Sequence, residues 1–141
     1  MFKTARKFTF DAAHMLDGHD GKCRNLHGHT YILQVEITGH LHESGPKRGM
    51  VMDFSDLKSA VQRHVIEPMD HAFIYDSGSE RECRLAATLQ SLDSKTCALP
   101  LRTTAEALAQ YIFRVLKEKA GLPVSRIRLW ETPNSHCEYS E

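Results

Sequence analysis

Apolar and polar residues alternate along two segments near the start of the sequence. In residues 2–14 the apolar face ends in a histidine and consists of Phe8, Phe10, Ala12 and His14. In residues 29–39, together with His27 just before them, the apolar face consists of His27, His29, Tyr31, Leu33, Val35 and Ile37. Because side chains two apart point to the same side of a strand, this period predicts two strands that each bury one face.

Two later segments have the spacing of amphipathic helices. The first follows Asp53 or Ser55 as a cap, ends at Pro68, and has an apolar side made of Phe54, Leu57, Val61 and Val65. The second begins with the capping-box pattern Thr103-Thr104-Ala105-Glu106 and continues with Leu108, Ile112, Val115 and Leu116. Gly121 and Pro123 then stop it, as these residue types commonly do. We therefore expect two helices, each with one buried side.

The rest of the sequence predicts two more strands and one irregular segment. Ile127, Leu129 and Glu131 share one face of a strand, and Cys137 alternates with Tyr139 on a short terminal strand. Residues 76–101 have no clean period, so we expect an irregular excursion with a short helix near residues 84–92. The order β-β-α-α-β-β predicts an α+β fold, in which an antiparallel four-stranded sheet carries two helices on one face.

Composition narrows the class of protein. The chain has 141 residues and no linker divides it, so residues 1–141 are interpreted as a single domain. Its 18 Lys and Arg residues balance 18 Asp and Glu residues, and this zero net charge argues against a nucleic-acid partner. No apolar run could span a membrane and the charged start does not resemble a signal peptide, so we expect a soluble, cytoplasmic protein. The four cysteines form no CxxC pair, which favours reduced thiols.

Three histidines on the apolar strand faces indicate a metal site. The side chains of His27 and His29 point to the same face of one strand and can converge on one point. The side chain of His14 projects from the apolar face of the other strand. Three neutral imidazoles bind Zn²⁺ and leave a fourth position open, as in catalytic zinc sites. A second pair with the same spacing, His40 and His42, lies among residues typical of a turn, so we expect a solvated loop there without metal.

Other polar residues have the chemistry that a zinc enzyme needs. Cys23, four residues before His27, is interpreted as a proton carrier, and the alternative makes its thiolate a fourth zinc ligand. Asp70 and His71 can form a proton relay, or only a local polar contact. Glu131, among apolar neighbours, can accept two N–H groups from a guanidine-like heterocycle edge, or else pair with an arginine.

Together these motifs resemble one enzyme family. Cys23-x-x-x-His27-Gly28-His29, His14 upstream, Asp70-His71 midway and Trp130-Glu131-Thr132 near the end are similar to the pattern of the 6-pyruvoyltetrahydropterin synthase and 6-carboxytetrahydropterin synthase family. The resemblance covers nearly the whole chain. It implies the tunnelling fold (T-fold), whose subunits assemble into a trimer, usually stacked into a hexamer, with active sites between subunits.

The resemblance also implies a role for each matching residue. It assigns zinc to His14, His27 and His29, and proton transfer to Cys23 with Asp70 and His71. It assigns pterin anchoring to Glu131 and places Thr103 and Thr104 in the pterin pocket, although helix capping is a sufficient reason for both threonines. The long stretch between Asp76 and Leu101 departs from the family pattern and leaves the shape of the pocket rim open.

Spacing within the motif favours one branch of the family. Three residues separate Cys23 from His27, which resembles the bacterial carboxytetrahydropterin enzymes, whereas the animal pyruvoyl enzymes have a longer interval. The implied reaction converts 7,8-dihydroneopterin triphosphate to 6-carboxy-5,6,7,8-tetrahydropterin with loss of acetaldehyde and triphosphate, toward queuosine and related deazapurines, and needs no nicotinamide or flavin. Two alternatives stay open: a synthase that stops at 6-pyruvoyltetrahydropterin, and a non-enzymatic zinc- or pterin-binding module.

Overall fold

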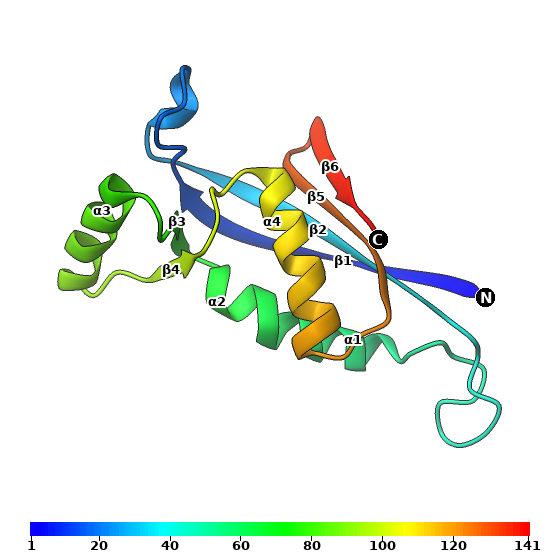
Figure 1. Ribbon diagram of the computed structural model, residues 1–141. Coiled ribbons are helices and arrows are strands. Elements are labelled where there is room, and N and C mark those ends of the chain that lie inside the picture. The colour runs from blue at the N-terminus through cyan, green and yellow to red at the C-terminus, as the bar shows by residue number, and fades with distance from the viewer.

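The computed structural model describes residues 1–141 and is built on one curled sheet, with the strand order β4-β3-β1-β2-β5-β6 (Figure 1). β1 (Phe2–His14) and β2 (His27–Gly39) form a long antiparallel hairpin. β5 (Val124–Thr132) and β6 (Ser135–Tyr139) extend the sheet antiparallel beyond β2. β3 (Ala72–Asp76) and β4 (Thr96–Leu99) extend it on the side of β1, and both run parallel to their neighbours.

Two long helices cover the same face of the sheet (Figure 1). The first consists of α1 (Phe54–Val61), a π-helical turn (Gln62–Ile66) and α2 (Glu67–Met69). The second consists of α4 (Ala105–Arg114) and a π-helical turn (Val115–Lys119). Both pack on the apolar strand face in one core of 24 buried residues, which includes Phe10, Leu33, Leu57, Val61, Leu108 and Ile112. None of the helices combines the length and the apolar composition that a membrane span requires.

The α+β class and the two helices on one face are confirmed, but the predicted four-stranded antiparallel sheet was wrong. The segment expected to be irregular contains β4 and a full helix, α3 (Glu80–Ser91), and β3 precedes them. The short helix expected near residues 84–92 is present as α3, but it begins earlier; the pattern predicted only part of it because the helix buries only Glu82 and Ala86 and has no continuous apolar stripe. The two short strands run parallel to their neighbours, which needs crossover connections that a local pattern does not reveal.

Helix boundaries also differ in two places. Pro68 does not end the first helix, which continues to Met69, because the π-helical turn before it has already changed the hydrogen-bond pattern. Thr104, not Thr103, is the N-cap of α4: its hydroxyl accepts a hydrogen bond from the Ala107 N–H at 3.3 Å. The predicted stop is confirmed, since the second helix ends before Gly121, which has a φ of +67° that favours glycine.

Candidate metal centre and active site

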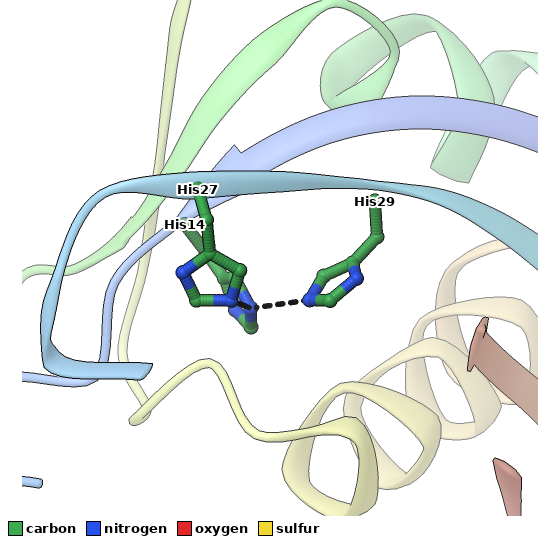
Figure 2. A group of neighbouring side chains, drawn as sticks. All are labelled: His14, His27 and His29. Atoms are coloured by element: carbon green, nitrogen blue, oxygen red, sulfur yellow. Dashed lines mark hydrogen bonds between the residues drawn. The ribbon is translucent and has the colours of Figure 1, made fainter. Parts of the chain in front are cut away.

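The hairpin of β1 and β2 brings the three histidines together where its two strands are joined. His14 at the end of β1 lies directly opposite His27 in the register, and His29 pairs with Ala12. The Nε2 atom of His14 lies 3.1 Å from Nε2 of His27 and 3.2 Å from Nε2 of His29. Figure 2 shows the three rings on one side of the hairpin, with these nitrogen atoms turned toward one another.

Backbone carbonyl groups set which nitrogen atom of two of these rings carries the proton. Nδ1 of His14 lies 2.9 Å from the Thr103 carbonyl oxygen, and Nδ1 of His27 lies 2.7 Å from that of Asn25. Because a carbonyl oxygen only accepts, each Nδ1–H donates, and each Nε2 of the neutral rings presents a lone pair. Two lone pairs facing each other at 3.1 Å repel unless a cation lies beside both, so this donor set fits a divalent metal.

Burial keeps His14 and His29 in the form that a metal needs. Desolvation lowers the pKa of His14 to about 4, against the opposing hydrogen bond to Thr103, and His27 and His29 lower it further. Burial likewise lowers the pKa of His29, and the neighbouring His27 adds to this shift. Both rings are therefore neutral near pH 7, with the lone pairs available to a metal ion.

A cavity of about 530 Å³ opens beside two of the histidines. Its walls are Lys22, Cys23, His27, His29, Glu131, Thr132 and Ser135. Cys23 reaches it from a short 3₁₀ turn, η1 (Lys22–Arg24), and Glu131 from β5. The structure therefore brings the predicted thiol and the predicted pterin anchor to the same space as the histidine cluster.

Glu131 has the surroundings of a binding group. Burial raises the pKa of its carboxyl group, and the nearby charge of Glu106 raises it further. Its carboxylate Oε1 lies 3.9 Å from Nε2 of His14, which is neutral, and no arginine pairs with it. A half-buried carboxylate without a cationic partner retains acceptor capacity for a ligand.

Thr103 and Thr104 have different positions. Thr103 is completely buried behind the cluster, and its hydroxyl oxygen lies 3.3 Å from Nδ1 of His14, in addition to the carbonyl contact. Thr104 caps α4 and lines a smaller cavity of about 220 Å³ that also includes Glu106 and Glu131. In this structure Thr103 orients a histidine, whereas Thr104 lies beside Glu131.

Asp70 and His71 do not line the cavity that contains Cys23. They lie between α2 and β3, where the Asp11 N–H donates to Asp70 Oδ1 at 3.0 Å and the His71 N–H donates to the Asp11 carbonyl. Asp70 Oδ1 is 3.0 Å from His71 Nδ1, so the carboxylate can orient the ring and leave Nε2 free. The backbone N–H of Asp11 is the main reason why the pKa of Asp70 is lowered.

His71 is unusual in two respects. Its φ is +59°, a conformation that is sparsely populated by non-glycine residues and is often found at functional sites. It lines a cavity of about 610 Å³ with Asp11, Gly28, His29, Thr30 and Lys95. Asp11 and Thr30 alternate with Ala12 and His29 along the strands, and residues of both sets line this cavity, including His29 of the histidine cluster.

Sequence reasoning missed the groups that orient the cluster. Asn25 supplies a carbonyl only two residues from His27, a distance at which a local contact could have been proposed. The Thr103 carbonyl is 89 residues from His14, and no pattern in the sequence indicates that contact. Lys22, the one cation on the wall of the Cys23 cavity, was also not identified.

Comparisons with known proteins point to one family. A family model described as 6-pyruvoyl tetrahydropterin synthase matches residues 3–141. The chain is 62% identical over 141 residues to a 6-carboxy-5,6,7,8-tetrahydropterin synthase of Haemophilus influenzae, covering 100% of both chains. It is 34% identical to the enzyme of the same name from Rickettsia bellii, covering 98% of this chain and 99% of that one. A solved structure of the 6-pyruvoyl tetrahydropterin synthase of Caenorhabditis elegans superposes with a TM-score of 0.69 at 25% identity, covering 99% and 95% of the two chains.

Proposed function

Since this chain belongs to the 6-pyruvoyl tetrahydropterin synthase family, we propose that it converts 7,8-dihydroneopterin triphosphate to 6-carboxy-5,6,7,8-tetrahydropterin in queuosine-type biosynthesis. The identity of 62% to a whole chain of that name is the observation that carries the product assignment. The cavity shared by Cys23, His27, His29 and Glu131 supports it, because it combines a proton carrier, a metal centre and a heterocycle anchor.

In this proposal zinc is held by His14, His27 and His29, whose neutral Nε2 atoms converge. Bound zinc would polarise the oxygen atoms of the substrate side chain and make the neighbouring C–H bonds more acidic. Thr103 and Asn25 serve this site indirectly, because their carbonyl groups hold His14 and His27 in the tautomer that faces the metal.

The residues of the cavity then have separate tasks. Glu131 accepts the N–H groups of the guanidine-like edge of the pterin, a bidentate contact that fixes the orientation of the ring. This contact places the side chain of the substrate toward Cys23, which moves a proton at the carbon attached to the ring. Thr104 lies beside Glu131 and contributes to the wall of the pterin pocket.

Asp70 and His71 complete the site from another subunit. His71 lines a different cavity from Cys23 in the same chain, so we infer that a proton relay between the Asp70-His71 pair and the thiol uses a second copy. We therefore propose a trimer or hexamer in which the Asp70-His71 pair of one subunit faces the Cys23 cavity of the next. The exposed His71 side chain, with 75% of its surface accessible, is available for such a contact.

The reaction is tested by mass spectrometry of the product formed from 7,8-dihydroneopterin triphosphate. A mass corresponding to the carboxy product, with acetaldehyde released in equal amount, supports the proposal. The pyruvoyl product would assign the chain to the other activity of the family, and an inert protein would leave a zinc- or pterin-binding module.

The shared site is tested by mixing two inactive variants, Cys23→Ala and His71→Ala, after dissociation and reassembly. If sites form between subunits, some mixed sites combine an intact Cys23 with an intact His71 and activity returns. If each chain contains its own complete site, the mixture stays inactive.

A further inference from the structure

The loop that carries Cys23 is closed by a hydrogen bond next to Asp17. The loop comprises residues 15–26 and extends beyond the end of the hairpin (Figure 1). The Leu16 N–H donates to the Cys23 carbonyl oxygen at 2.9 Å, which joins the two sides of the loop. Asp17 follows Leu16 directly in the chain. Contacts that hold Asp17 in place therefore also hold the Leu16 N–H, which is the hydrogen-bond partner of the Cys23 carbonyl.

Asp17 contacts two distant parts of the chain. The Ser79 hydroxyl donates to Asp17 Oδ2 at 2.9 Å, and Arg81 Nη1 lies 3.7 Å from Oδ1. Arg102 Nη2 donates to the Asp17 carbonyl oxygen at 3.1 Å. Ser79 and Arg81 are at the start of α3, and Arg102 lies in the connection between β4 and α4. These contacts connect the loop 15–26 to α3 and to the segment before α4.

The contact with α3 is well defined because Ser79 is also the N-cap of that helix. Its hydroxyl oxygen accepts a hydrogen bond from the Glu82 N–H at 3.2 Å while it donates to Asp17, and the residue is only 9% exposed. Glu82 is 1% exposed, and its carboxylate accepts a hydrogen bond from the Asp76 backbone N–H at 3.2 Å. A buried hydroxyl with both a donor and an acceptor partner has one orientation, so α3 and Asp17 are held in a fixed relation.

We propose that Asp17 is a positioning residue of the active site, which through Ser79, Arg81 and Arg102 holds the loop 15–26 in the conformation that presents Cys23 to its cavity. The inference rests on the proposed catalytic role of Cys23. It also gives a function to the long segment 77–101, because α3 supplies two of the three contacts. Displacement of a reacting group by about 1 Å can reduce turnover by about 100-fold, so fixing this loop matters for rate.

The test compares Asp17→Ala with a matched control, Asp20→Ala. Asp20 lies in the same loop but is fully exposed, and its one ionic contact is with the His19 ring at 3.8 Å. We expect Asp17→Ala to lower kcat by roughly 10- to 100-fold, with KM changed by less than about two-fold and zinc content unchanged. Hydrogen exchange of the Leu16 amide and alkylation of Cys23, both followed by peptide mass spectrometry, should change in Asp17→Ala and not in Asp20→Ala.

A second pair of variants tests the same contact from the side of α3. Ser79→Ala removes the contact to Asp17 and should reproduce the kcat and exchange changes, whereas Ser79→Thr keeps the hydroxyl and should restore both. Wild-type kcat and Leu16 exchange in Asp17→Ala would overturn the inference, as would equal losses in Asp17→Ala and Asp20→Ala.

The exchange and alkylation measurements need no turnover, so they remain decisive if the wild-type protein does not form the carboxy product. In that case the proposed function fails while faster Leu16 exchange in Asp17→Ala still supports the role of Asp17. Unchanged Leu16 exchange would then overturn it independently.

Discussion

Two pairs of histidines in this chain have the same spacing and different surroundings. His27 and His29 lie on one face of β2, where His14 meets them from β1 and a carbonyl oxygen fixes the His27 ring. His40 and His42 lie just beyond the other end of β2, in an exposed loop where backbone groups make hydrogen bonds, such as the one from the Gly49 N–H to the His42 carbonyl. The difference shows that spacing alone does not make a metal site: it needs a strand that aims the rings, a third ring from a neighbouring strand, and groups that set the tautomers.

If Cys23 were a fourth zinc ligand, the cluster of His14, His27 and His29 would be a closed structural site and not a catalytic one. In the proposed role Cys23 carries a proton, so Cys23→Ala should keep stoichiometric zinc and lose about two to four orders of magnitude in turnover. Zinc content and rate must be measured on the same preparation. Loss of zinc in parallel with activity would favour the four-ligand site, and near-normal turnover would remove Cys23 from the proton transfer.

The burial of His14 can be measured through its effect on stability. The folded protein holds the pKa of His14 near 4, below the unfolded value of 6.5, so protonation favours the unfolded state. Stability from this group is therefore complete above about pH 6.5 and falls as the pH drops toward 4, by about 3 kcal/mol in the metal-free protein.

Urea unfolding of chelator-treated protein at pH 7 and pH 4 checks this expectation. Other groups also titrate in this range, so the quantity to compare is the difference between wild type and His14→Ala. The pH dependence should be smaller by about 3 kcal/mol in His14→Ala and unchanged in the loop variant His40→Ala. An identical pH dependence in all three proteins would mean that His14 is not desolvated as the structure indicates.

Glu131→Gln should weaken pterin binding and leave the zinc content unchanged, because Glu131 is proposed to bind the heterocycle and the histidine cluster to bind the metal. The substitution replaces one acceptor oxygen by a donor that faces the N–H groups of the pterin, at a cost of about 1–3 kcal/mol in binding. This corresponds to roughly 5- to 150-fold in Kd. A dihydropterin ligand titrated by calorimetry gives the Kd, and zinc content serves as the control. Unchanged affinity would indicate a structural role for Glu131.

The sequence was sufficient for the parts of the site that depend on local geometry. Strand periodicity placed His14, His27 and His29 on facing positions, and the structure brings their nitrogen atoms together. The family predicted from the Cys23 to Glu131 motifs is confirmed by the match over residues 3–141. The roles of the individual residues stay predictions.

What the sequence did not reveal depends on contacts between distant residues. The Thr103 carbonyl orients His14 although the two residues are 89 positions apart. Every residue has a backbone carbonyl, so the residue type at position 103 does not indicate this contact. The segment 76–101 contains more regular structure than the sequence indicated. Its helix α3 is largely polar, and parallel pairing of β3 and β4 has no local signature. Likewise, no local pattern indicates that His71 and Cys23 line different cavities of the chain.

The most direct test of the central claim is the zinc content of two matched double variants after dialysis. His27→Ala/His29→Ala and His40→Ala/His42→Ala remove the same atoms at the same spacing from the same chain. If the cluster is the metal centre, the first variant should lose nearly all of its zinc, because one imidazole cannot hold a labile divalent ion, and the second should keep the wild-type amount. Full zinc occupancy in the first variant, or equal loss in both, would contradict the account.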